Sequence, residues 1–379
     1  MGSESVRLNV IAIGGRHQLL HILPLALELS RRNMIDCRIF VADDDERNIV
    51  LRLASRLAID APDISVMSLG PVGSKLPKKI ARLWKWRNEL RSADALLSAE
   101  RTSTILKRLP GRCPPFLHIL HGAGDREKGF EPRLGLFDFV FTAGEKDRQR
   151  IIEAGLQDES RVAAIGGIKI AVTRALPPPP KLFANELPIV LYNPHFSRKL
   201  GTFHQVAEPM IRQFGGTDRY NLVIAPHVRL KSTMTPSEVA DWNSRSGENI
   251  LVDMGSDRSN DMTYTRSADV YIGDVSSQVY EFIIQPRPCV FVDANDTDWR
   301  DDPNYRMWQF GEVLSPDADF VAAADDAIAQ FSRFYDLQAK SLRDTYAGLE
   351  QSSGNLLKSA ADLAETVIVQ LGSNGRSRQ

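Results

Sequence analysis

The 379-residue sequence predicts an α/β protein with two Rossmann-like, doubly wound domains, and three stretches support this fold class. The apolar segment Val6–Ile13 runs into Gly14-Gly15 and an amphipathic helix, which is the usual opening of such a domain. Four consecutive prolines, Pro177–Pro180, cannot continue a helix or a sheet and therefore indicate a stiff linker. Beyond the linker, Ser267–Asp293 has the pattern of strand, hydroxyl-rich turn, helix and strand, which is a βαβ unit.

The length favours two domains, because a single hydrophobic core rarely grows to this size. We expect an N-terminal acceptor-side domain, a proline-rich linker, a nucleotide-donor domain, and a C-terminal helix with a frayed tail. Their predicted ranges are 1–175, 176–186, 187–350 and 351–379. Amphipathic periodicity predicts the last helices over 320–334, 337–349 and 355–371.

The composition is that of an ordinary soluble protein, with 43% hydrophobic residues, 25% charged residues and a net charge of −1. This balance excludes the strongly basic surface of a bulk nucleic-acid binder. The three cysteines are widely separated, which predicts reduced thiols without a zinc site or a disulfide framework. No apolar run is long enough to span a bilayer and no signal-peptide core is present, so we expect a cytoplasmic protein.

The turn Asp274-Val275-Ser276-Ser277 lies between a predicted strand and a predicted helix. Backbone N–H groups at a helix start are unpaired and favour an anion, and the two serine hydroxyls add donors there. The alternative is that Ser276 and Ser277 only cap the helix.

Two further strand ends in the second half carry a histidine and an arginine: His195 with Arg198, and His227 with Arg229. Parallel strands present their carboxyl ends at one edge of a sheet, so these groups can converge on Asp274 and its serines. Cations and hydroxyls at such an edge suit a pyrophosphate. Each histidine taken alone is more often structural.

In the first half, a predicted strand at 116–120 delivers His121-Gly122 at its carboxyl end. A histidine at that position has the placement of a general base, although it can equally serve only to hydrogen-bond the turn. His17 follows the glycine turn and is a second functional candidate. His17 and His21 share a helix face, but no third metal ligand is evident, so we predict no metal site.

Residues 75–112 form a basic stretch in which lysines and arginines alternate with apolar residues and two tryptophans. This composition is expected of a segment that touches anionic lipid headgroups or an anionic acceptor. The alternative is a charged helix that packs Trp84 inward and exposes its lysines.

The order of these motifs resembles that of the CDP-glycerol glycerophosphotransferase family, the teichoic-acid polymerase-like transferases with the GT-B fold. The motifs are His121-Gly122, then Asn193–Arg198, then Pro226-His227, then Gly273–Ser277, and an apolar strand that begins at Pro288. The resemblance covers about residues 116–370, with Val275 where the family has tyrosine. It implies two domains that face each other across a cleft, and C-terminal helices.

The resemblance implies transfer of a glycerol- or ribitol-phosphate from a CDP-activated donor to a hydroxyl of a cell-surface glycan or lipid-linked acceptor. This chemistry is expected to need no metal and no cofactor, and to take place at the inner face of the cell membrane. His121 would be the base, and His227 the second catalytic residue. The donor nucleotide and its phosphates would be held by His195, Arg198, Arg229, Asp274, Ser276, Ser277 and Glu281, and the acceptor side would include Gly14, Gly15, His17 and Arg126.

Two alternatives stay open. The same strand-end cluster would serve a GT-B glycosyltransferase or a sugar-nucleotide 2-epimerase that uses a UDP-sugar. A non-catalytic nucleotide-binding protein could also retain the fold, and it would bind nucleotide without turnover.

Overall fold

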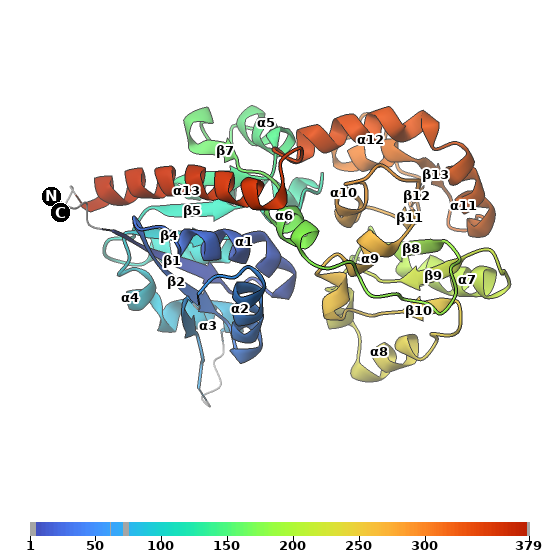
Figure 1. Cartoon of the computed structure of the whole chain (residues 1–379), viewed down its shortest axis with the longest axis horizontal. Helices are drawn as coiled ribbons and strands as arrows, with labels where there is room; N and C mark the ends of the chain where they lie inside the picture. The colour runs from blue at the N-terminus through green and yellow to red at the C-terminus, as the bar shows by residue number, and fades with distance from the viewer. Residues whose placement is uncertain (1–4, 61, 71–75, 377–379) are drawn as a thin grey trace. The chain divides into compact units, whose positions relative to one another are not determined.

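The computed structural model describes residues 5–60, 62–70 and 76–376, and the chain divides into two compact units (Figure 1). The first unit comprises residues 1–122, 130–176 and 344–379, and the second comprises 123–129 and 177–343. Each unit has its own parallel sheet with helices on both faces, which confirms the predicted fold class of two Rossmann-like α/β domains.

The sheet of the first unit has the strand order β3-β2-β1-β4-β5-β6-β7, and every described pairing is parallel. Its strands are β1 Val6–Ala12, β2 Ile35–Val41, β3 Asp63–Val66, β4 Ala95–Ser98, β5 Phe116–Ile119, β6 Phe139–Thr142 and β7 Val162–Ala164. Alternate residues of β1 enter two separate cores: Leu8 and Val10 pack on one face of the sheet, and Ile11 on the other. Both faces are therefore covered, as is usual for a parallel sheet.

The helices of the first unit are α1 Arg16–Leu29, α2 Asp44–Arg56, α3 Lys78–Lys85, α4 Arg87–Leu90, α5 Glu145–Glu153, α6 Ile168–Ala175 and α13 Ser353–Arg376, with short 3-10 turns η1 Thr102–Arg108, η3 Pro132–Leu136 and η4 Glu159–Arg161. In Figure 1 the red helix α13 runs along the sheet beside the blue helix α1. Leu357, Ala361 and Ile368 of α13 belong to the same core as β1 and α1.

The sheet of the second unit has the order β10-β9-β8-β11-β12-β13, again with parallel pairing throughout the described strands. Its strands are β8 Ile189–Asn193, β9 Asn221–Ile224, β10 Ile250–Val252, β11 Val270–Gly273, β12 Cys289–Val292 and β13 Glu312–Leu314. Its helices are α7 Phe203–Gly215, α8 Pro236–Asn243, α9 Thr263–Ser267, α10 Gln278–Phe282, α11 Phe320–Ala329 and α12 Ser332–Thr345, with 3-10 turns η2 Glu127–Gly129, η5 Leu230–Thr233, η6 Asp257–Ser259 and η7 Pro303–Phe310.

The structure differs from the sequence prediction in several elements. The strands β3, β4 and β13 were not predicted, and the predicted helix over 320–334 is interrupted between Ala329 and Ser332. Helix α13 is part of the first unit rather than a segment of its own, because its apolar side completes the core beside β1. Residues 377–379 of the predicted frayed tail lie outside the described residues.

Helix α13 offers a direct test of this core. We expect Ile368→Ala, which empties a fully buried position, to lower the free energy of unfolding by about 2–5 kcal/mol. The matched control is Leu363→Ala, on the same helix but 37% exposed, which should cost about 1 kcal/mol or less. Urea unfolding of the full chain measures both. Equal losses would show that α13 does not complete the core.

Candidate active site

The carboxyl ends of β8, β9 and β11 form the centre of the candidate site in the second unit. β8 pairs with β9 on one side and with β11 on the other, and the strand order reverses between β8 and β11. Ligands of doubly wound sheets bind at this reversal, at the carboxyl edge. The structure thus brings together the strand ends that carry His195, His227 and Asp274.

The buried carboxylate of Asp274 links the turn after β11 to the loop after β8. It accepts hydrogen bonds from the backbone N–H of His195 at 2.8 Å and of Thr202 at 2.8 Å, and from the Thr202 hydroxyl at 3.0 Å. The N–H of Val275 donates to the same carboxylate at 2.6 Å. Removal from water raises the pKa of Asp274 to about 6, and these hydrogen bonds offset part of the rise. Asp274 therefore holds the loop in place rather than facing solvent.

The amide of Asn193, at the end of β8, joins all three strand ends. Its Nδ2 donates to the carbonyl of Ala225 after β9 at 2.5 Å and to the side chain of Gln278 at 2.6 Å. Its Oδ1 accepts from the buried hydroxyl of Ser276 at 2.6 Å. The Ser276 hydroxyl therefore has a partner inside the protein, whereas Ser277 is half-buried and makes no side-chain cap of α10. The sequence analysis named Asn193 only as the start of a motif and gave it no role, although a polar residue that closes a buried strand could have signalled one.

His195, Phe196 and His227 form a ring cluster, in which the two imidazole centroids lie 6.0 Å apart. The guanidinium of Arg229 stacks on Phe196, 4.1 Å from the ring centroid. The Nδ1 of His195 accepts from the Ser197 N–H at 3.2 Å, and the Nδ1 of His227 accepts from the Arg229 N–H at 3.2 Å. A neutral imidazole with an acceptor at Nδ1 carries its proton on Nε2. In the neutral form both rings therefore carry their proton on Nε2.

The segment Ala123–Gly129, which directly follows His121-Gly122, is part of the second unit. The buried carboxylate of Asp125 accepts from the Tyr280 hydroxyl at 2.6 Å and from the Met307 N–H at 3.1 Å. A Cβ on Gly124 would lie 2.8 Å from the Cβ of Ser277, so the segment lies against the turn after β11. Close contact requires glycine at this position.

Three other predicted donor-side and acceptor-side residues lie as follows. Arg198 is exposed. The pKa of His204 is lowered first by burial and then by the charge of Arg198. Glu281 is buried on α10. The pKa of Tyr271 is raised first by burial and then by the charge of Asp274, and Glu281 makes a smaller contribution. Arg126 belongs to the second unit, where its guanidinium lies 5.4 Å from the Tyr305 ring centroid.

In the first unit, the turn after β1 and the end of β5 bring together a second group of histidines. His17 and His121 lie with ring centroids 6.0 Å apart, and the N–H of Gly122 donates to Nδ1 of His21 at 3.5 Å. The pKa of His21 is held well below its ordinary value, first by burial and then by electrostatic repulsion from Lys169, His121 and His17. The turn and the strand end therefore form one site.

The tautomer of His121 is set by its two neighbours. Nδ1 lies 2.7 Å from the carbonyl oxygen of Ala99, which can only accept, so Nδ1 carries the proton. Nε2 of the neutral ring is then an acceptor, and the amide nitrogen of Gln18 lies 3.1 Å from it. Sequence reasoning did not select Gln18. Its amide occupies the space beside Gly14, where an added Cβ would lie 1.6 Å from its Oε1.

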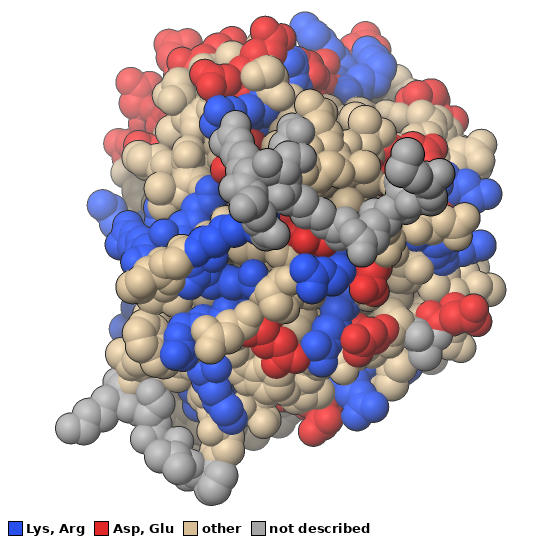
Figure 2. Space-filling view, turned by 90° about the vertical axis from the view of Figure 1, so that its left-hand side faces the viewer, with Lys and Arg blue, Asp and Glu red and all other residues tan. Residues whose placement is uncertain are grey.

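The basic stretch forms α3, α4 and η1, and Lys75 lies outside the described residues. Trp84 is 53% exposed rather than packed inward, and the guanidinium of Arg87 lies 4.9 Å from its ring centroid. Lys78, Lys85 and Arg108 are exposed on these elements. In the space-filling view of Figure 2, Lys and Arg side chains gather on the left half of the face. In the described part of the chain, no helix is long and apolar enough to cross a membrane.

Solved structures with the same architecture include two enzyme classes. The chain superposes on a putative UDP-N-acetylglucosamine 2-epimerase from Listeria monocytogenes with a TM-score of 0.66 and 15% identity, over 96% of this chain and 97% of that one. The UDP-GlcNAc 2-epimerase from Neisseria meningitidis bound to UDP-GlcNAc gives a TM-score of 0.60 and 12% identity, over 96% and 99%. A variant of the wall teichoic acid polymerase TagF with CDPG gives 0.60 and 12%, over 97% and 89%.

These likenesses confirm the GT-B-like fold of two Rossmann-like units. No protein-family model and no curated protein sequence matches the chain.

The raised pKa of Asp274 predicts a pH-dependent stability. The folded state keeps this proton up to about pH 6, whereas the unfolded chain loses it near the ordinary value of 3.8. The contribution of Asp274 to stability is therefore present in full below pH 3.8 and is lost as the pH rises to 6, a change of about 3 kcal/mol. We expect the unfolding free energy of the wild type minus that of Asp274→Asn to fall by most of this amount between pH 4 and pH 7. A difference that stays constant or rises would contradict the assignment.

Proposed function

We propose that the protein is an enzyme that binds a nucleotide-diphosphate-activated donor at the carboxyl edge of the second unit's sheet. The observation that carries this proposal is the pair of Nε2–H groups of His195 and His227, fixed as donors by backbone N–H groups that occupy both Nδ1 atoms. Arg229 adds a full positive charge beside them, on Phe196. Charge-assisted donors from neighbouring strand ends are what a diphosphate requires.

The turn after β11 is suited to the same anion. The oxygens of Asp274 accept hydrogen bonds from inside the protein, which lessens the repulsion that an exposed carboxylate would exert on a phosphate. Ser277 is the serine of this turn whose hydroxyl can reach a ligand, whereas Ser276 supports it by holding Asn193. Glu281 remains a proposed partner of the ribose and Arg198 a proposed phosphate ligand.

His121 is the proposed acid–base residue. The carbonyl of Ala99 keeps the proton on Nδ1, so that Nε2 can take a proton once the Gln18 amide yields its place. Gly14, Gly15 and His17 are proposed to meet the acceptor or the transferred group, because their turn lies beside His121. Arg126 is proposed for the same role from segment 123–129.

The leading candidate for the donor is a UDP-sugar, which makes the protein a 2-epimerase or a glycosyltransferase. Its support is the likeness over nearly the full length to two epimerases, one of them solved with UDP-GlcNAc. The second candidate is a CDP-activated polyol, transferred as its phosphate to a hydroxyl acceptor. Its support is the order of motifs from His121-Gly122 to Ser276-Ser277, together with the likeness to TagF.

For the transferase candidate, the basic surface of α3, α4 and η1 is the proposed contact with an anionic acceptor or membrane face. Its cations and the exposed indole of Trp84 are suited to headgroups or to a polyanionic glycan. Such contact would place the enzyme at the inner face of the cell membrane.

A thermal-shift series with UDP-GlcNAc, CDP-glycerol and CDP-ribitol tests the donor site. One nucleotide class should raise the melting temperature of the wild type, and His227→Ala should abolish most of this rise because a phosphate donor is lost. The control is His204→Ala, which removes an exposed histidine of α7 from the same unit and should leave the shift intact. No shift with any of the three ligands would contradict the proposal.

His121→Ala separates an enzyme from a nucleotide-binding protein. We expect it to lower turnover of the stabilising donor by about 10²–10⁴-fold, because proton transfer is lost, while the donor-induced thermal shift is kept. Turnover is measured by chromatography of the nucleotide products. Near-normal turnover in the variant would rule out His121 as the base, and binding without turnover in the wild type would favour the non-catalytic alternative.

A further inference from the structure

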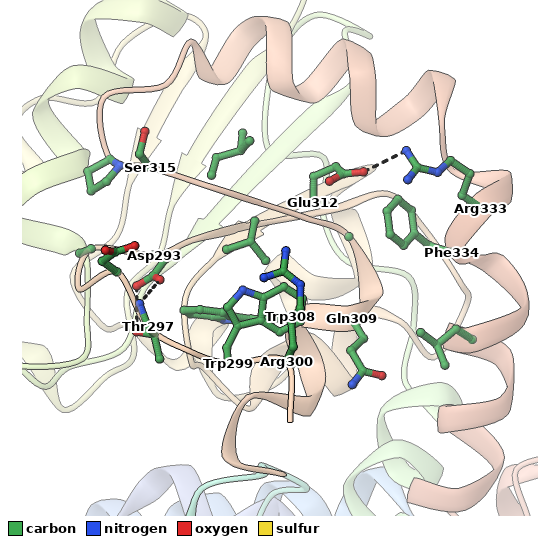
Figure 3. A pocket seen from close by; sticks show the side chains of 17 residues that line it. Asp293, Thr297, Trp299, Arg300, Trp308, Gln309, Glu312, Ser315, Arg333 and Phe334 are labelled. Carbon is green, nitrogen blue, oxygen red and sulfur yellow. Dashed lines mark hydrogen bonds and ion pairs between the residues drawn. The ribbon is translucent and has the colours of Figure 1, made fainter. Parts of the chain in front are cut away.

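A large pocket of the second unit lies beside the edge strand β13 (Figure 3). In the sheet, β12 and β13 lie on the side of β11 that is away from β8 and β9. Its volume is about 840 Å³, which is the size of a small-molecule site. The walls come from the loop after β12, from η7, from β13 and from the start of α12. The proposed donor site uses other residues, at the ends of β8, β9 and β11.

Two indoles meet in the pocket, as Figure 3 shows. Trp308 is buried, and Trp299 is partly exposed and lies edge to face with it at 5.9 Å between ring centroids. The guanidinium of Arg300 lies 5.1 Å from the Trp299 ring centroid. An exposed indole beside a pocket offers a flat apolar surface with a polar edge.

Three carboxylates, of Asp293, Asp296 and Glu312, and two guanidinium groups, of Arg300 and Arg333, line the pocket. Asp293 accepts hydrogen bonds from the N–H of Thr297 at 2.6 Å and from its hydroxyl at 3.0 Å. Glu312 is paired with Arg333 at 3.0 Å. The lining thus contains both signs of charge and no cationic cluster of the kind that a phosphate needs. Arg300, Gln309 and Ser315 add exposed hydrogen-bonding groups.

We propose that this pocket binds a neutral saccharide. A sugar ring has one face of C–H groups, which can stack on Trp299, and a rim of hydroxyls, which can pair with Arg300, Gln309 and Ser315. A lining with no excess of positive charge and with planar polar side chains suits such a ligand better than an anion. That this saccharide is the glycan acceptor of the enzyme rests on the proposed function, whereas the binding itself does not.

Trp308 connects this pocket to the donor turn. Its indole N–H donates to the backbone carbonyl of Asp274 at 2.8 Å, so the ring that forms part of the pocket also holds the turn that bears Ser277. A sugar stacked on Trp299 is therefore linked to the donor turn through the contact of Trp299 with Trp308 and the hydrogen bond of Trp308 to Asp274. This arrangement suits an acceptor whose binding is sensed at the donor turn.

Fluorine NMR of the 5-fluorotryptophan-labelled full chain tests the saccharide site without any nucleotide. The chain has five tryptophans, Trp84, Trp86, Trp242, Trp299 and Trp308, and each signal is assigned by its Trp→Phe variant. Titration with chitotriose, maltotriose and cellotriose should shift the signals of Trp299 and Trp308 saturably with at least one sugar, and leave the other three in place. Shifts confined to Trp84, Trp86 or Trp242, or no shift with any of the three sugars, would overturn the proposal.

Two variants locate the binding. Trp299→Ala should weaken sugar binding at least tenfold in calorimetry, whereas Tyr335→Ala, which removes an exposed aromatic ring of α12 outside the lining, should not change it. If Trp299→Ala fails to fold, Gln309→Ala replaces it, because Gln309 is an exposed lining residue, and it should weaken binding severalfold. Unchanged affinity in the folded variant would overturn the assignment.

Titration with CMP and UMP completes the series, and a saturable shift of Trp299 with these nucleotides but with no sugar would identify a nucleotide pocket instead. The donor-induced thermal shift is measured on the same variants. A variant that loses sugar binding but keeps this shift shows that the saccharide site and the donor site can fail independently.

Discussion

The buried carboxylate of Asp274 is the constraint on which the geometry of the second unit's site depends. Through it, the turn after β11 fixes the backbone of His195 and Thr202, and hence the course of the loop after β8. Burying a carboxylate is costly, and the protein offsets the cost with several donors that converge on one side chain. These hydrogen bonds hold the loop after β8, so that the imidazole of His195 has a defined position. Trp308 adds a second support, since it binds the carbonyl of the same residue.

The histidines of the two units differ in the hydrogen bond that each makes at Nδ1. A carbonyl at Nδ1 leaves His121 with an acceptor at Nε2, and a backbone N–H at Nδ1 leaves His195 and His227 with donors. The same side chain thereby has an acceptor at Nε2 in one unit and a donor at Nε2 in the other, which are the forms that the proposed proton abstraction and phosphate binding require. His118 is a contrast: it stacks on Phe137 inside the first sheet, and burial lowers its pKa to about 3. His118 lies within its strand, whereas the other three histidines follow the ends of strands. This position, more than the residue type, distinguishes a packed histidine from one at the edge of the sheet.

The sequence allowed prediction of the features that follow from local pattern and parallel topology. Apolar runs followed by polar turns located β8, β9 and β11, and parallel pairing then required His195, His227 and Asp274 to share an edge. Contacts between segments far apart in the chain could not be predicted in this way. Gln18 meets His121 across 103 residues and Asp125 meets Met307 across 182, and no local pattern specifies such partners. β4 was missed because its short apolar run cannot be told from a helix segment in the basic stretch, and β13 because it has only two apolar residues.

Helix α13 also bears on how the chain is made. It follows all other described elements in the chain, yet its apolar side belongs to the core around β1, which is made much earlier. The second unit, by contrast, has all of its segments by residue 343, including 123–129. During synthesis the second unit can therefore finish folding while the first unit still exposes a hydrophobic face that α13 has yet to cover. A chain truncated before residue 353 would keep a folded second unit and offer that face to chaperones and proteases.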